Sequence, residues 1–163
     1  MQAVTIETSN HTIIQGYWFT PENVEANSIK GQVVIASAMG AAQDFYQPFA
    51  KWLTELGYSV LTFDCSGMGK SKTKHVKEYQ CDLLEWAQQE YSAALKFVID
   101  QNSNAPIFWL GHSLGGQVFP LVENIEQVSI GDKVAIMLSL KGDNQTNSYG
   151  NTWFKVTSIN GDT

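Results

Sequence analysis

The architecture of this 163-residue chain follows from one run, Trp109-Leu110-Gly111-His112-Ser113-Leu114-Gly115-Gly116-Gln117. Its centre fits the G-x-S-x-G pattern, in which a sharp strand-to-helix turn exposes a serine hydroxyl. A buried-strand pattern precedes the turn and an apolar helix pattern follows it, as that motif requires. The run therefore predicts a nucleophile elbow with Ser113 as the catalytic serine and Gly111 and Gly115 as its crowding-relieving glycines. A helix-capping serine in a glycine-rich turn is the alternative interpretation.

Short apolar runs without alternation predict strands that are buried on both faces of a sheet. Such runs lie at residues 32–37, 58–63, 106–110 and 134–140, with helical patterns at about 44–56, 83–99 and 113–122 between them. Strands that alternate with helices indicate an α/β fold, with a mostly parallel sheet and helices on both faces. Residues 3–7 and 13–19 predict an N-terminal hairpin. Phe45, Phe49, Trp52, Leu53 and Leu56 recur at the spacing of a helix that ends at Gly57.

The chain resembles the N-terminal part of an α/β-hydrolase, over residues 3 to about 140. It is similar to bacterial predicted α/β-hydrolases of the esterase and serine aminopeptidase S33-like group. The motifs that carry the resemblance lie, in the family's order and spacing, at residues 33–40, 45–50, 57–64, 67–71 and 111–117. The resemblance implies the α/β-hydrolase fold, C-terminally incomplete, as a single domain over residues 1–163.

The resemblance also implies a reaction, the hydrolysis of a carboxylic ester or an amide through an acyl-enzyme on Ser113. It implies an oxyanion hole formed by the backbone N–H groups of Met39 and Leu114. An ordinary strand-to-helix turn is the alternative for residues 39–42. Residues 64–71 resemble the family's D-x-x-G-x-G-x-S loop, whose glycines shape the backbone; the run lacks the spacing of a phosphate-binding loop.

The general base of this site is missing from the sequence, because no histidine follows Ser113. His112 is expected to point away from the nucleophile's face, His75 lies in a basic loop, and His11 lies in the N-terminal turn. Asp143 is the least unsuitable acid, although it fits a loop residue better. Two interpretations stay open. The chain is either a serine hydrolase that is incomplete and impaired, or a non-catalytic α/β-hydrolase-like module for binding or assembly.

Composition excludes several classes of partner. The net charge of −6 and the absence of arginine argue against a nucleic-acid groove. The one basic cluster, Lys70, Lys72, Lys74 and Lys77, is interpreted as a solvated loop. No apolar run is long enough for a membrane span, and the first residues lack the pattern of a secretory signal, so a cytoplasmic location is expected.

The cysteines, Cys65 and Cys81, are expected to be free thiols, and neither a metal site nor a cofactor is implied. The expected ligand is a small-molecule ester or amide. The run at residues 134–140 would be the last strand, with one side bare, because residues 153–156 are too few to classify. An open edge strand recruits other chains, so a homo-oligomer through this edge or poor solubility is expected.

Overall fold

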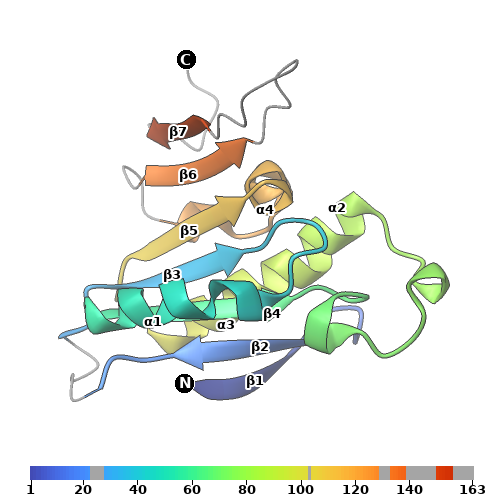
Figure 1. Cartoon of the computed structure of the whole chain (residues 1–163), viewed down its shortest axis with the longest axis horizontal. Coiled ribbons are helices and arrows are strands. Elements are labelled where there is room, and N and C mark those ends of the chain that lie inside the picture. The colour runs from blue at the N-terminus through green and yellow to red at the C-terminus, as the bar shows by residue number, and fades with distance from the viewer. Residues whose placement is uncertain (23–27, 103, 129–132, 139–149, 156–163) are drawn as a thin grey trace.

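The computed structural model describes residues 1–22, 28–102, 104–128, 133–138 and 150–155. Its strands form one seven-stranded sheet in the order β1-β2-β4-β3-β5-β6-β7 (Figure 1). The strands are β1 (Gln2–Glu7), β2 (Ile13–Phe19), β3 (Gly31–Ala36), β4 (Tyr58–Asp64), β5 (Ile107–His112), β6 (Lys133–Leu138) and β7 (Gly150–Lys155). The pairs β3–β4, β3–β5 and β5–β6 are parallel, and the flanking pairs are antiparallel. The predicted α/β architecture and the N-terminal hairpin are therefore confirmed.

Helices cover both faces of this sheet, as predicted (Figure 1). They are η2 (Gln43–Tyr46), α1 (Gln47–Glu55), η3 (Gly69–Ser71), η4 (Val76–Glu78), α2 (Leu83–Glu85), η5 (Trp86–Tyr91), α3 (Ser92–Gln101), α4 (Leu114–Gln117), η6 (Phe119–Leu121) and η7 (Ile125–Gln127). One face packs against η5, α3 and α4 in a core that includes Tyr91, Leu95 and Trp109. The smaller core on the other face joins η2 and α1 to β3 and β4 through Tyr46, Ala50 and Val60.

Two predicted helices differ from the observed ones. The helix expected over residues 83–99 contains a π-helical turn, η5, in which the Ala87 carbonyl accepts hydrogen bonds from Ser92 N–H and from Ser92 Oγ, the latter at 2.8 Å. The helix expected over residues 113–122 ends at Gln117 and continues as the 3₁₀ turn η6. Pro120 explains this change, because it has no N–H to donate to the carbonyl of the preceding helical turn.

The expectation of a bare edge beside the last strand was wrong. Strand β7 pairs antiparallel with β6, from Lys133 opposite Lys155 to Leu138 opposite Gly150, so β6 lies between β5 and β7. The terminal strands of the sheet are β1 and β7. Since β6 is paired on both sides, the argument that predicted a homo-oligomer through its bare side no longer applies.

The periodicity predicted helix α1 but did not indicate which side of it faces the sheet. Tyr46, Ala50 and Leu53, spaced like successive helical turns, pack against β3 and β4. The other apolar side chains of this segment lie toward solvent, with exposed fractions of 72% for Phe45, 39% for Phe49, 51% for Trp52 and 41% for Leu56. Both sides of the helix are apolar, so hydrophobic spacing alone could not distinguish them.

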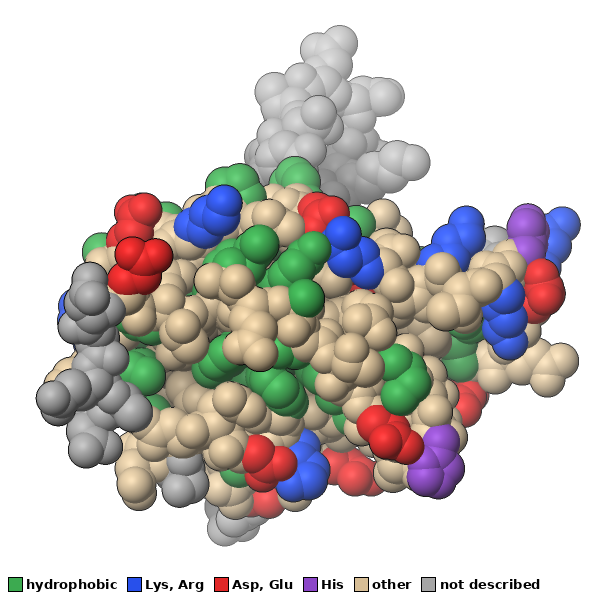
Figure 2. All heavy atoms as spheres, turned by 90° about the horizontal axis from the view of Figure 1, so that it is seen from below, with side chains coloured by type: hydrophobic (Ala, Val, Ile, Leu, Met, Phe, Trp, Pro, Cys, Tyr) green, Lys and Arg blue, Asp and Glu red, His purple; other side chains and the backbone are tan. Residues whose placement is uncertain are grey.

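The basic loop is solvated, as predicted. Residues 72–80 project from the body of the molecule, and Figures 1 and 2 show this projection at the right, with lysines and a histidine gathered on it. Cys65 is buried, Cys81 is half-buried, and both are free thiols. In the part of the chain that the structure describes, no membrane-crossing helix and no metal-binding cluster of His, Cys, Asp or Glu is found.

Trp52 tests the orientation of α1, and Trp18 of β2 is the buried reference. Trp18 is 7% exposed and packs edge-on against Phe97, whereas Trp52 is 51% exposed. We expect Trp18→Ala to lower the free energy of unfolding by about 3–5 kcal/mol. Trp52→Ala should lower it by about 1 kcal/mol or less, because its ring already lies largely in water. Urea unfolding measures both, and equal losses would contradict the observed orientation of α1.

Candidate active site

Ser113 stands at a strained turn between β5 and α4. Its backbone has φ 51° and ψ −112°, in the region that residues with a side chain rarely adopt. Its carbonyl oxygen accepts hydrogen bonds from the N–H groups of Gly116 at 3.0 Å and Gln117 at 3.1 Å. Its hydroxyl makes no capping hydrogen bond to α4, contrary to the alternative interpretation. The hydroxyl of this half-buried serine is therefore not used to end the helix.

The two glycines that flank the turn occupy positions with no room for a side chain. A Cβ on Gly111 would lie 2.4 Å from the N and Cα atoms of Gly116. A Cβ on Gly115 would lie 2.1 Å from the carbonyl oxygen of Ala36, at the end of β3. These contacts are with backbone atoms, which cannot swing aside as a flexible side chain would. The close approach of β3, β5 and α4 thus requires glycine at both positions.

Trp109 holds the same turn from the core, a role that the sequence pattern did not predict. Its indole Nε1 donates a buried hydrogen bond of 2.9 Å to the carbonyl oxygen of Gly115. Its ring packs at 5.3 Å from Phe119 and 6.1 Å from Tyr91. A tryptophan on the strand that leads into the motif was the available signal, since a buried indole N–H needs an acceptor.

Among the backbone N–H groups of residues 38–41, in the loop after β3, that of Met39 alone has no acceptor in the described part of the chain. Ala38 N–H donates to Tyr46 Oη at 3.0 Å, Gly40 N–H to Met68 Sδ at 3.3 Å, and Ala41 N–H to the Ala38 carbonyl at 3.0 Å. For Met39 N–H, the described residues provide no acceptor. Gly40, at φ 77°, supplies the left-handed conformation of this tight turn.

Leu114 is the first residue of α4, so its N–H has no acceptor within the helix. The end of β3 and the Ser113 turn are adjacent, because Ala36 is the parallel partner of Gly111. The two amides predicted for an oxyanion hole thus belong to turns that follow neighbouring strands.

Tyr46 connects these two turns. Its hydroxyl oxygen lies 3.0 Å from Ala38 N and 2.8 Å from His112 Nδ1. Burial raises the pKa of the Tyr46 phenol, and the hydrogen bond from Ala38 opposes this shift. Tyr46 belongs to the smaller core, between α1 and the sheet. The structure buries it, while the neighbouring Phe45 lies toward solvent.

No histidine–carboxylate pair is found at Ser113 within the described residues. His112 Nδ1 is engaged by Tyr46, and His75 is exposed on the basic loop. His11 does meet a carboxylate, with its Nδ1 2.7 Å from Glu7 Oε1, but this exposed pair lies in the N-terminal turn. Asp143 lies outside the described residues.

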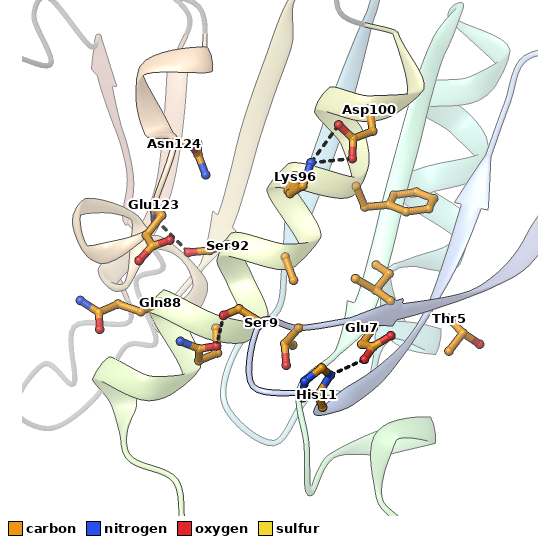
Figure 3. A pocket seen from close by; sticks show the side chains of 15 residues that line it. Thr5, Glu7, Ser9, His11, Gln88, Ser92, Lys96, Asp100, Glu123 and Asn124 are labelled. Carbon is orange, nitrogen blue, oxygen red and sulfur yellow. Dashed lines mark hydrogen bonds and ion pairs between the residues drawn. The ribbon is translucent and has the colours of Figure 1, made fainter.

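A cavity of about 550 Å³ lies away from Ser113, between β1, the turn that follows it, η5 and α3 (Figure 3). Its lining includes the apolar side chains of Ile6 and Phe97, and several of its polar groups pair with one another. Lys96 Nζ meets Asp100 at 2.9 Å, and Glu123 N–H donates to Ser92 Oγ at 2.8 Å. None of Ser113, Met39 and Leu114 lines it, so cavity size alone does not identify the site.

The loop at residues 64–71 is shaped by Asp64, in agreement with the interpretation from sequence. The buried Asp64 carboxylate accepts hydrogen bonds from Gln43 N at 2.8 Å, Gln43 Nε2 at 2.9 Å and Lys70 N at 2.9 Å. A Cβ on Gly69, which has φ 40°, would lie 2.2 Å from Asp64 Oδ2. The loop folds around this carboxylate, and Gly69 allows the approach.

Glu90, in the π-helical turn, anchors the same loop and was not predicted. Its carboxylate accepts hydrogen bonds from the N–H and the hydroxyl of Ser66, and the residue is 4% exposed. Burial raises the pKa of Glu90, and the hydrogen bonds from Ser66 oppose this rise. Nothing in the sequence around Glu90 distinguishes it from an exposed glutamate of a surface helix, so its burial could not be predicted.

The turn geometry predicts unequal costs for two glycine substitutions. Gly115→Ala should lower the free energy of unfolding by about 3 kcal/mol, because the new methyl group meets the Ala36 carbonyl. Gly40→Ala is the control, since a Cβ there meets nothing within 4 Å. It should cost about 1 kcal/mol, from its positive φ alone. Urea unfolding compares them, and an equal or smaller loss for Gly115→Ala would contradict the close approach.

The raised pKa of Glu90 predicts a pH-dependent stability. A carboxyl whose pKa is higher in the folded than in the unfolded state weakens folding once it ionises. Its contribution is fully present below the unfolded pKa of about 4 and is lost as pH rises through the folded pKa. We expect the unfolding free energy of wild type, relative to Glu90→Gln, to fall as pH rises above the unfolded pKa of about 4. The exposed Glu55→Gln is the control. A difference between wild type and Glu90→Gln that rises with pH would contradict the buried setting of Glu90.

Comparison with known proteins places this geometry in a family. Residues 27–123 match the family model described as serine aminopeptidase, S33. No curated protein sequence matches the chain. A carboxyl esterase from Bacillus coagulans has a similar structure, with a TM-score of 0.60 and 20% identity over 73% of this chain and 38% of that one. A monoglyceride lipase from Saccharomyces cerevisiae has a TM-score of 0.58 and 18% identity over 74% of this chain and 39% of the lipase.

An α/β serine hydrolase without a lid, from Xanthomonas campestris, has a TM-score of 0.56 and 19% identity over 72% of this chain and 52% of that protein. At these low sequence identities, the structural similarity shows the fold alone, which is that of the α/β-hydrolases. The chain spans 38–52% of the length of these three proteins. Since the family match covers more than half of its residues, the chain belongs to the serine aminopeptidase S33 family of α/β-hydrolases.

Proposed function

We propose that this chain carries the nucleophile half of a serine-hydrolase site, which acts on a carboxylic ester, or less readily an amide, through an acyl-enzyme on Ser113. The observation that carries the proposal is the strained Ser113 backbone at φ 51°, with a hydroxyl that does not cap the helix it precedes. Backbone strain of this kind costs about 1–3 kcal/mol and persists where the surrounding structure enforces it. Membership in the S33 family supports the same conclusion.

The proposed reaction begins with attack of Ser113 Oγ on the substrate carbonyl carbon. The carbonyl oxygen becomes an oxyanion, and the N–H groups of Met39 and Leu114 stabilise it. One donor of an oxyanion hole typically contributes about 3–4 kcal/mol to the stability of the transition state. The tetrahedral intermediate then expels the alcohol or amine, and the acyl group stays on Ser113. Both amides are free of acceptors in their own turns, which supports this assignment.

The same proposal implies that the chain alone is a poor catalyst. The proton of Ser113 needs an acceptor, and the described histidines are engaged elsewhere or lie on other elements. We propose that the base and its acid come from polypeptide outside these 163 residues, in keeping with the greater length of the structural relatives. Loss of a triad member leaves the residual catalysis of the oxyanion hole and of substrate binding.

A non-catalytic module is the second candidate, and one observation favours it. No histidine of the described residues is placed to accept the proton of Ser113, because His112 Nδ1 contacts Tyr46 while His11 and His75 lie on other elements. A site of this kind would bind a carbonyl compound in the crevice without turning it over. The two candidates differ in whether Ser113 reacts when a base is supplied, which can be tested directly.

We expect a fluorophosphonate probe to label Ser113 slowly, and free imidazole to accelerate the labelling by supplying the missing base. Intact-protein and peptide mass spectrometry would locate and time the adduct. Ser113→Ala should abolish it, whereas Ser9→Ala, at an exposed serine of the N-terminal turn, should not change it. If the folded chain stays unlabelled with imidazole present, the hydrolase proposal fails and the binding module remains. Fast Ser113-dependent ester turnover without imidazole would instead refute the claim that the chain alone lacks a general base.

A further inference from the structure

One phenol group, that of Tyr46, touches both turns of the candidate site, and the role inferred for it rests on the proposed function. The Tyr46 residue is 7% exposed, and its ring lies 6.0 Å from the His112 ring, edge to face. Its hydroxyl oxygen is within hydrogen-bond distance of Ala38 N, at 3.0 Å, and of His112 Nδ1, at 2.8 Å. The first contact reaches the loop after β3, and the second reaches the residue directly before Ser113.

The chemistry of the three groups fixes the direction of both hydrogen bonds. A backbone N–H can only donate, so Ala38 donates to the Tyr46 oxygen. The proton of the Tyr46 hydroxyl then needs an acceptor, because a buried polar group without a partner costs about 1–3 kcal/mol. His112 Nδ1 is the acceptor within reach. Tyr46 therefore donates to Nδ1, and neutral His112 carries its proton on Nε2.

We propose that Tyr46 is a positioning residue, whose hydroxyl joins the loop after β3 to the Ser113 turn and leaves Met39 N–H as the amide that faces the substrate oxygen. Tyr46 occupies Ala38 N–H, while Gly40 N–H contacts Met68 Sδ at 3.3 Å. Of the amides at residues 38–41, Met39 N–H alone has no acceptor among the described residues. The link thus sets both which amide is free and where it lies relative to Ser113.

The same link removes His112 from the choice of bases. With Nδ1 accepting from Tyr46 and the proton on Nε2, neutral His112 has no lone pair left to take the proton of Ser113. Its position beside the serine is then explained by the connection to Tyr46 and not by proton transfer. This agrees with a base that comes from elsewhere.

Nitrogen-15 NMR of the wild-type chain tests the link without any variant. We expect a His112 imidazole with a protonated Nε2 and an unprotonated Nδ1, and an Ala38 amide that exchanges with solvent much more slowly than the amide of Met39. A protonated Nδ1 in neutral His112, or equal exchange at the two amides, would overturn the proposal.

The variant Tyr46→Phe removes the hydroxyl and keeps the ring. We expect Ala38 exchange to accelerate by about tenfold or more, and the His112 nitrogens to shift toward a mixture of tautomers. Tyr58→Phe is the matched control, because Tyr58 lies in the same packed layer, edge-on to Phe108 at 5.9 Å. Its hydroxyl has no hydrogen-bond partner among the described residues. Unchanged Ala38 exchange and His112 nitrogens in folded Tyr46→Phe would overturn the proposal.

The consequence for reactivity is measured separately. In the presence of imidazole, Tyr46→Phe should slow fluorophosphonate labelling of Ser113 by about tenfold, since a misplaced donor weakens stabilisation of the charged intermediate. Tyr58→Phe should label at the wild-type rate. If wild type does not label, the proposed hydrolase function fails, while the NMR result still decides the link. If Tyr46→Phe labels at the wild-type rate, the positioning role is refuted while the hydrolase function stands.

Discussion

The contact between the Ser113 turn and the end of β3 is the constraint on which the candidate site depends. A Cβ at Gly115 would fall 2.1 Å from the Ala36 carbonyl oxygen, so helix α4 reaches this strand only through glycine. The contact brings the loop after β3 beside the Ser113 turn, because Ala36 and Gly111 are parallel partners. A serine hydroxyl and an amide from a different loop can act on one carbonyl group only when that gap is closed.

The loops that follow β3, β4 and β5 meet at one edge of the sheet, as the carboxyl ends of parallel strands must. They hold one another by hydrogen bonds between loops. Gln43 joins the first loop to Asp64 of the second, and Tyr46 joins it to His112 at the end of β5. The conformation of each loop is therefore set in part by neighbours far away in the sequence.

Features set by local pattern could be predicted from the sequence, and features set by distant contacts could not. The central strands, the hairpin and the turn at Ser113 follow from apolar runs and glycine spacing. Strand β7 was missed because its pairing with β6 depends on the partner strand more than on its own short run. The bond between Tyr46 and His112 carries no local signature, and neither does the side of α1 that faces the sheet.

The backbone donors and the proton acceptor of the proposed site depend on different parts of the fold, for a physical reason. Backbone donors such as the N–H groups of Met39 and Leu114 are fixed as soon as the turns that contain them fold. A proton acceptor must be a side chain on some further element, aimed at Ser113 Oγ from outside the turn. The first half of the fold can therefore prepare the charge-stabilising part of the site without the proton-transfer part. The engagement of His112 by Tyr46 fits this separation, because the histidine nearest in sequence maintains the turn and takes no proton.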